Sequence, residues 1–195
     1  MHRTGQTALV ALGALLSWLM LGQLILVEDV GSRTTFDPRR LLLYVLLLTA
    51  PMLTFVPLAR WARAPFYDLE AVAGWGTLGY VVAVVTPAEP PTLAQFLLFL
   101  LPLTVALATV ATLGSYLVGL RFYRHDRRRY DFVRARRQGY LVALVLVACM
   151  LLFSIGTLSP TSAVLLLVVA VLAEMFSLSR DSQRLRQGIE RRLSS

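Results

Sequence analysis

Hydrophobic residues along the chain are gathered into six long runs separated by short polar segments. The runs fall at residues 7–27, 41–59, 69–86, 93–120, 139–158 and 161–178. Each approaches or exceeds the ~20 apolar residues that an α-helix needs to cross the hydrocarbon core of a bilayer. The pattern predicts an all-α fold, a single integral membrane bundle of six transmembrane helices.

The first run is longer than the core of a signal peptide, which has about 7–15 apolar residues. Residues 28–30, Glu-Asp-Val, do not form the small-residue cleavage site that a signal peptide needs. We therefore expect a retained first transmembrane helix.

Proline and polar residues mark the start and the interior of the second helix. Asp37-Pro38 is a typical helix start, because Asp caps free N–H groups and Pro suits the first turn. Pro51 removes an interior hydrogen bond and predicts a kink, with Thr49 and Thr54 near enough to bond the released backbone groups.

The third run is the least hydrophobic, and Asp68 is its expected N-cap. Residues 74–79 match G-x-G-x-x-G, but this nucleotide-binding pattern has meaning only between a strand and a helix. Glycines in an apolar helix instead allow close helix packing, and Gly79 with Ala83 forms a small-x-x-x-small pair.

The fourth run, residues 93–120, would span about 42 Å as a helix, which exceeds a ~30 Å hydrocarbon core. It must tilt, protrude or bend at Pro102. Ala111, Ser115 and Gly119 recur every four residues, which predicts a face of small residues packed closely against a neighbouring helix.

The last two runs are separated by Ser159-Pro160, a short helix-start signal that predicts an antiparallel hairpin. In the basic tail, residues 179–195, helical spacing places Leu185, Ile189 and Leu193 on one face. This predicts a short amphipathic helix on the inner leaflet.

The segment 121–138, between the fourth and fifth runs, is strongly basic and orients the whole chain. Short loops rich in Lys and Arg are retained in the cytoplasm, so we expect this loop and both termini to be cytoplasmic. With six spans, sixteen of the nineteen arginines then lie on that side. The loop arginines are the expected contacts for anionic lipid or a protein partner: Arg121, Arg124, Arg127, Arg128, Arg129, Arg134, Arg136 and Arg137.

Composition supports the membrane assignment and narrows the partners. A chain of 195 residues that is 57% hydrophobic and only 15% charged is not a soluble domain. The net charge of +8 lies at the ends of apolar runs, which favours membrane lipids, above all anionic ones, and other membrane subunits over nucleic acid. The absence of Lys and Asn suggests a GC-rich prokaryote, which predicts the cytoplasmic (inner) membrane.

No catalytic, cofactor-binding or metal-binding pattern is present. His2 and His125 have no Cys or carboxylate at ligand spacing, and Cys149 is single and lies in an apolar run. An intramembrane lipid enzyme would need paired acids or histidines. We therefore expect no cofactor and no metal, and nothing in the sequence indicates an enzyme.

One set of polar residues within the apolar runs is a possible intramembrane site. Glu174 is an ionisable residue in a span and so a candidate for proton or cation work, or else an interfacial ion-pair partner near the inner end of its helix. The possible site consists of Glu174, Thr49, Thr54, Thr77 and Thr104.

The last third of the chain resembles a known kind of protein. The residues concerned are Arg137-Gln138-Gly139, the turn Leu158-Ser159-Pro160 and Ala173-Glu174. They look like the end of small uncharacterised bacterial polytopic membrane proteins, a resemblance that implies a membrane bundle and no particular activity.

These observations favour a non-catalytic multi-pass membrane protein, an accessory, assembly or scaffold subunit with a basic cytoplasmic face. The alternative is a small-solute transporter or channel with its site among helices two, three and four. A polar cavity among those three helices would favour the transporter, and a tightly packed core would favour the subunit.

Overall fold

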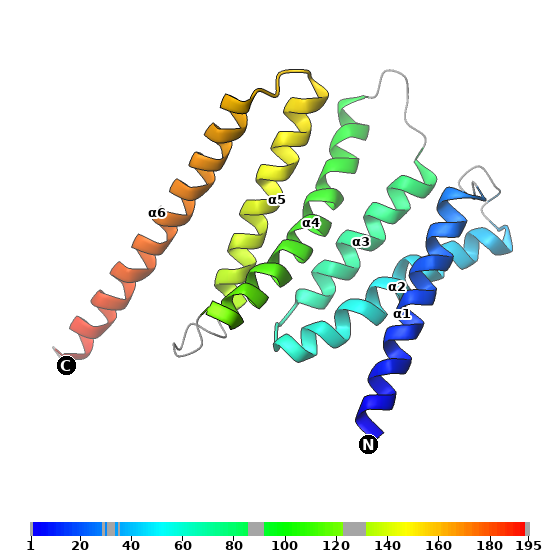
Figure 1. Cartoon of the computed structure of the whole chain (residues 1–195), viewed down its shortest axis with the longest axis horizontal. Helices are drawn as coiled ribbons and strands as arrows, with labels where there is room; N and C mark the ends of the chain where they lie inside the picture. Colours follow the sequence, from blue (N-terminus) through cyan, green and yellow to red (C-terminus); the bar gives the residue numbers. More distant parts are fainter. Residues whose placement is uncertain are drawn as a thin grey trace. The chain divides into compact units, whose positions relative to one another are not determined.

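The described part of the chain consists of six α-helices joined by short connections. A computed structural model describes residues 2–28, 30, 34, 36–85, 92–122 and 132–193. The helices are α1 (His2–Leu26), α2 (Pro38–Ala62), α3 (Tyr67–Val84), α4 (Leu93–Phe122), α5 (Phe132–Ser154) and α6 (Pro160–Leu193) (Figure 1). The predicted all-α fold is confirmed for these residues.

Four helices are long and apolar enough to cross a membrane: α1, α2, α4 and α5. By length and composition the chain is therefore a multi-pass helical membrane protein. The other two helices, α3 and α6, are not among these four. Helix α3 has 18 residues with Asp68 and Glu70 in its first turn, and the apolar part of α6 covers only Pro160–Phe176.

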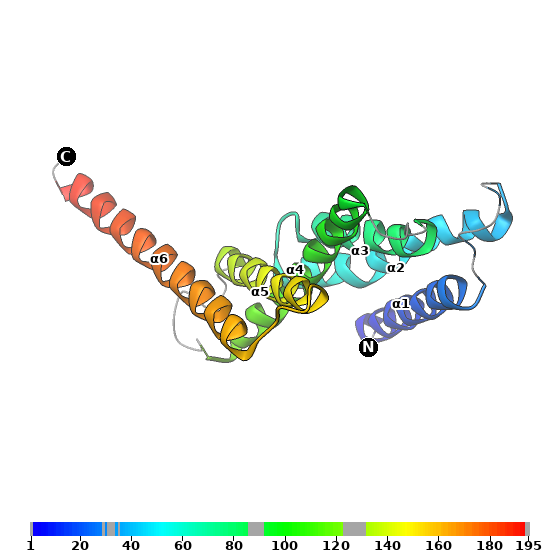
Figure 2. The ribbon, with the colours of Figure 1, turned by 90° about the horizontal axis from the view of Figure 1, so that it is seen from above.

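The structure divides into two compact units, Met1–Tyr140 and Leu141–Ser195. In the first unit, neighbours in sequence pack together: α1 against α2, α2 against α3, and α3 against α4. Figures 1 and 2 show α3 lying between α2 and α4. The second unit contains most of α5 and all of α6.

Helices α5 and α6 each extend well beyond the predicted span at one end. Helix α5 begins at Phe132, so residues 132–138, expected in the loop, form its first turns. Helix α6 runs unbroken to Leu193, although a separate tail helix was expected. In both places the added residues are mostly good helix formers, and a single Gly188 costs only about 1 kcal/mol in a helix interior.

The predicted caps are partly right. Asp37 caps α2 by accepting a hydrogen bond from Arg39 N, and Ser159 caps α6 by accepting one from Ser162 N. The expected cap of α3 is wrong, because the helix begins at Tyr67 and Asp68 lies inside its first turn. Phe66 precedes it with φ of 64°, so a tight left-handed turn starts α3 two residues early.

Glycines of α3 permit close contact with both neighbouring helices, as predicted. A Cβ on Gly74 would lie 2.8 Å from Val105 Cγ1 of α4. One on Gly76 would lie 3.2 Å from the carbonyl oxygen of Leu47 in α2, and one on Gly79 would overlap the Leu47 side chain. The three glycines therefore serve two interfaces, α3 with α4 and α3 with α2.

The predicted packing of Gly119 on α4 is wrong. No described atom lies within 4 Å of a Cβ built on Gly119, whereas Ala108, Thr112 and Tyr116 are buried. The packed face is thus displaced from the predicted one by a single residue, or about 100° around the helix. The prediction considered only small residues, so it missed the face that contains Thr112 and Tyr116.

Candidate functional site

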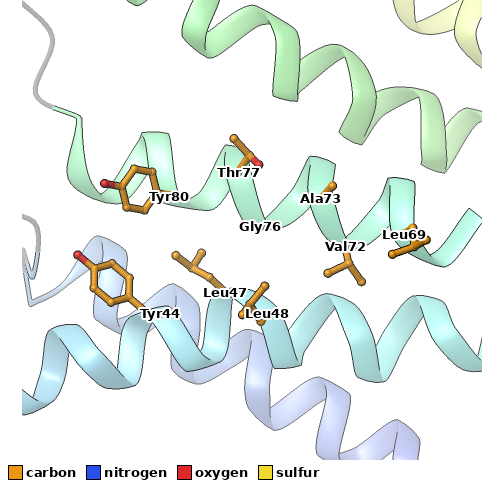
Figure 3. Close-up of a pocket in the computed structure, with 9 residues that line it drawn as sticks. All are labelled: Tyr44, Leu47, Leu48, Leu69, Val72, Ala73, Gly76, Thr77 and Tyr80. Carbon is orange, nitrogen blue, oxygen red and sulfur yellow. The ribbon is translucent and has the colours of Figure 1, made fainter.

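A groove between α2 and α3 is a feature of the first unit that could hold a ligand. Its volume is about 460 Å³, and it opens to the surface of the unit. Figure 3 shows its lining: Tyr44, Leu47, Leu48, Leu69, Val72, Ala73, Gly76, Thr77 and Tyr80. Six of these nine residues have no polar side-chain group, so most of the groove is lined by hydrocarbon.

The two ends of the groove differ in polarity. Tyr44 and Tyr80 face each other at one end with their ring centres 6.1 Å apart, and both hydroxyls point away from Leu69 (Figure 3). Arg40 Nε donates a hydrogen bond of 2.9 Å to the Tyr44 hydroxyl. A guanidinium therefore stands at this end, whereas Leu69 closes the other with an apolar side chain.

Where α2 and α3 approach closely beside the groove, a proline of α2 releases a backbone carbonyl that lies against a glycine of α3. Pro51 has no N–H, so it cannot bond the carbonyl of Leu47 one turn earlier. That carbonyl lies against Gly76, where a side chain would crowd it. The released carbonyl thus faces the backbone of α3, and the predicted bond from Thr54 goes to Ala50 O instead.

A smaller cavity of about 120 Å³ lies between α3 and α4. Pro102 and Val105 of α4 line one side. Ala73 and Thr77 line the other side and also line the α2–α3 groove, so the two features are neighbours across α3.

The structure does not gather the predicted threonines around one polar cavity. Thr77 lines both cavities, but Thr49, Thr54 and Thr104 line neither. Thr54 accepts a 2.9 Å hydrogen bond from Trp18 Nε1, and Thr104 donates to Leu100 O at 2.7 Å. These two hydroxyls thus form hydrogen bonds within the bundle. Glu174 lies in α6, in the other unit, and its role stays a prediction.

Sequence reasoning missed a continuous set of aromatic contacts through the first unit. Trp18 of α1 meets Trp75 of α3 edge-on at 5.5 Å between ring centres, and Trp75 stacks on Phe55 of α2 at 6.3 Å. Tyr67 contacts both Phe55 and Phe132 edge-on. The rings come from four helices, so no spacing within one apolar run could have revealed them.

The polar tips of these aromatic residues are bonded inside the bundle. Tyr67 donates from its hydroxyl to Thr109 O at 2.9 Å, and Trp75 Nε1 donates to Thr109 Oγ1 at 3.3 Å. Thr109 in turn donates to Ala106 O at 2.7 Å. Because each donor has a partner in the protein, the centre of this unit is a packed core with satisfied polar groups.

The described arginines of the basic segment lie at one end of the first unit. Arg121 is exposed in the last turn of α4, and Arg134, Arg136 and Arg137 lie in the first two turns of α5. Figure 1 places these turns at the same end as the α2–α3 connection. The other predicted contacts lie outside the described residues: Arg124, Arg127, Arg128 and Arg129.

Two ion pairs mark the opposite ends of the first unit. Arg136 of α5 pairs with Glu70 in the first turn of α3. Arg39 in the first turn of α2 pairs with Glu28, just beyond α1, at 2.6 Å. Each pair links two different segments at the end of a bundle, as residues near headgroup water do.

Searches for known chemistry and for relatives return little. Within the described ranges, no three His, Cys, Asp or Glu side chains lie close enough to hold a metal ion. Comparison with protein-family models, with curated proteins and with solved structures gave no match for this chain.

Proposed function

We propose that the protein is a non-catalytic accessory, assembly or scaffold subunit of a prokaryotic inner membrane. Its six helices all cross the bilayer, with both termini in the cytoplasm. The basic end binds anionic lipid or an acidic partner. The apolar faces pack against lipid and other membrane subunits.

The packed centre of the first unit is the observation that carries this proposal. A transporter needs a polar cavity near the middle of the bundle. Among the described residues of α2, α3 and α4, Thr54, Thr104 and Thr109 bond to backbone or indole groups, and both cavities have apolar linings. A rigid packed bundle suits a subunit that positions other molecules.

Chain direction supports counting α3 as a span. Helices α2 and α4 both carry arginines near their C-terminal ends, at the same end of the unit. The chain must therefore return across the bilayer between them, and α3 is the helix that the described residues 63–85 form there. Its 18 residues extend about 27 Å, close to the ~30 Å hydrocarbon thickness.

Cysteine labelling in intact cells tests the topology. In a Cys149→Ala background, single cysteines at positions 89 and 159 should react with an impermeant maleimide. A cysteine at position 125 should react only after permeabilisation. The reverse pattern would overturn the orientation, and labelling of positions 89 and 125 on the same side would overturn the crossing by α4, which lies between them.

Two matched double variants test the basic end. Each arginine near an anionic surface contributes about 1 kcal/mol, so Arg128→Gln with Arg129→Gln should weaken binding of phosphatidylglycerol by at most roughly thirtyfold. The control, Arg33→Gln with Arg39→Gln, removes the same charge from the connection between the first two spans, which the proposed topology puts on the other side of the membrane. Native mass spectrometry from vesicles of phosphatidylethanolamine and phosphatidylglycerol measures the enrichment. Equal enrichment in both variants would contradict the proposal.

The transporter stays the alternative because of one observation. Thr77 lines both the groove and the smaller cavity, and Pro102 of α4 borders the latter. A passage would therefore have to open past Thr77. Solute uptake by reconstituted vesicles that is lost in Thr77→Leu would favour this alternative over the subunit.

A further inference from the structure

We propose that residues 60–66, which we call the α2–α3 corner, anchor the bundle in the headgroup layer of the membrane. Exposed rings of the corner enter the lipid, and its arginines contact lipid phosphates. The inference rests on one part of the proposed function, that α2 crosses the bilayer. It adds to the basic end a contact that depends on aromatic rings as well as on charge.

The backbone of the corner is unusual at two positions. Arg63 has φ of 52° and Phe66 has φ of 64°, both in the left-handed region. Residues with a Cβ meet a steric cost in this region, whereas glycine does not. Arg63 is also the C-cap of α2, and a left-handed residue at the end of a helix is usually glycine. The chain therefore has a guanidinium and a ring at two positions whose backbone geometry favours glycine.

The left-handed turn separates buried from exposed residues of the corner. Ala64 and Tyr67 are buried and belong to the hydrophobic core of this end of the unit. Phe66, between them, is 68% exposed, and Trp61 is 59% exposed. Such an exposed ring contributes little to packing, so contacts inside the bundle do not offset the steric cost at Phe66. Backbone strain of this kind points to a function of the side chain outside the bundle.

A further ring and a further cation lie beside the corner, at the end of α4. Trp61 meets Tyr116 of α4 edge-on, with ring centres 6.2 Å apart, and the Tyr116 hydroxyl donates to Ala62 O at 3.4 Å. Arg121 and Phe122 follow Tyr116 after little more than one turn of helix, and both are exposed. Rings and cations thus occur together on two neighbouring helices at one end of the unit.

The charge at this end is positive among the described residues. Arg60 and Arg63 of the corner are both exposed. The acids of this end are Asp68 and Glu70, in the first turn of α3. The described arginines outnumber them: Arg60, Arg63, Arg121, Arg134, Arg136 and Arg137. An anionic group such as a phosphate is therefore favoured over a cationic one.

A lipid surface is the partner that matches both kinds of side chain. Trp61 lies 23 residues beyond Pro38, or about 35 Å along α2, slightly more than the ~30 Å of a hydrocarbon core. It therefore falls at headgroup level, where aromatic rings are enriched in membrane proteins. Rings at this level bury about 5–10 Å into the boundary between headgroups and acyl chains. Guanidinium groups beside them form charge-assisted hydrogen bonds with phosphate.

Fluorescence quenching by brominated lipid tests the position of the corner. The chain has three tryptophans, Trp18, Trp61 and Trp75, so the difference between wild type and Trp61→Phe gives the Trp61 signal. The purified protein is reconstituted in phosphatidylcholine brominated either near the headgroup or near the methyl end of its acyl chains. Bromine near the headgroup should remove most of the Trp61 signal, whereas deep bromine and aqueous iodide should each leave most of it.

The signal that remains in Trp61→Phe separates this proposal from the proposed function. Trp18 and Trp75 contact each other near the middle of α1 and α3, so deep bromine should quench them more than shallow bromine. That result, together with a Trp61 signal quenched only by iodide, would overturn the corner and leave the bundle in the bilayer. Phosphatidylcholine has no net charge, so a failure of the basic-end proposal would not change the measurement.

Two variants at one position test the ring of Phe66. Phe66→Gly removes the ring and relieves the left-handed backbone, so its unfolding temperature in detergent should be no lower than that of wild type. In vesicles it should weaken the shallow quenching of Trp61, because one of the rings that fix the depth of the corner is lost. The control Phe66→Tyr keeps a ring and should keep the quenching.

Three results would overturn the proposal. A Trp61 signal quenched by iodide but not by lipid bromine would place the corner in water, where a protein partner could cover it. A lower unfolding temperature of Phe66→Gly would mean that the ring packs within the bundle. Equal shallow quenching of Trp61 in Phe66→Gly and Phe66→Tyr would mean that the ring does not anchor the corner.

Discussion

Gly139→Ala is expected to destabilise the first unit by about 3 kcal/mol, the upper end of the range for overpacking. Gly139 of α5 lies against Thr112 of α4, which is 2% exposed. A Cβ on Gly139 would stand 2.5 Å from Thr112 N and 2.7 Å from its Cα. Real Cβ atoms do not approach backbone so closely, so the two helices would have to separate.

The same position permits a sharp control, because the clash involves backbone. The double variant Thr112→Ala with Gly139→Ala should recover little stability, since Thr112 N and Cα remain in place. Gly114→Ala, in open space on α4 among the described residues, should be neutral or slightly stabilising, because Ala favours a helix over Gly. Thermal unfolding in detergent measures all three. Rescue by the double variant would contradict the close backbone contact.

Tyr67→Ala should cost about 3–5 kcal/mol, the usual range for removing a buried aromatic ring. Tyr67 is 1% exposed and meets Phe55 and Phe132 edge-on, with ring centres 6.1 and 5.5 Å apart. Its ring therefore joins α2, α3 and α5. Thermal or denaturant unfolding of the detergent-solubilised protein, with tryptophan fluorescence as the probe, gives the loss.

Tyr67→Phe separates the hydroxyl from the ring. It keeps the aromatic contacts and removes only the hydrogen bond to Thr109 O, so the expected cost is about 1 kcal/mol. Thr109 O keeps no such donor in this variant. Tyr80→Phe, at an exposed ring, is the matched control and should change stability very little. Comparable losses at the two positions would mean that the Tyr67 hydrogen bond does not form.

Helix positions followed from the sequence because bilayer thickness imposes a length on every apolar run. The predicted spans 41–59 and 93–120 fall inside α2 and α4, and Asp37-Pro38 marks the observed start of α2. The start of α5 and the end of α6 could not be predicted from the sequence, because arginine-rich segments such as residues 132–138 form helix as readily as loop. Polarity locates a membrane boundary, but a helix can continue beyond that boundary.

The sequence by itself determined that the chain is an all-α membrane protein, and it identified the α3 glycines as points of close contact. Hydropathy and the positions of small residues are properties of a single segment, so they can be recognised in the sequence of one helix alone. Only the tertiary structure decided which face of α4 is packed, that Tyr67 joins three helices, and that Tyr44, Tyr80 and Arg40 border one groove. These features depend on the rotation of each helix about its axis, and a shift of one residue turns a face by about 100°.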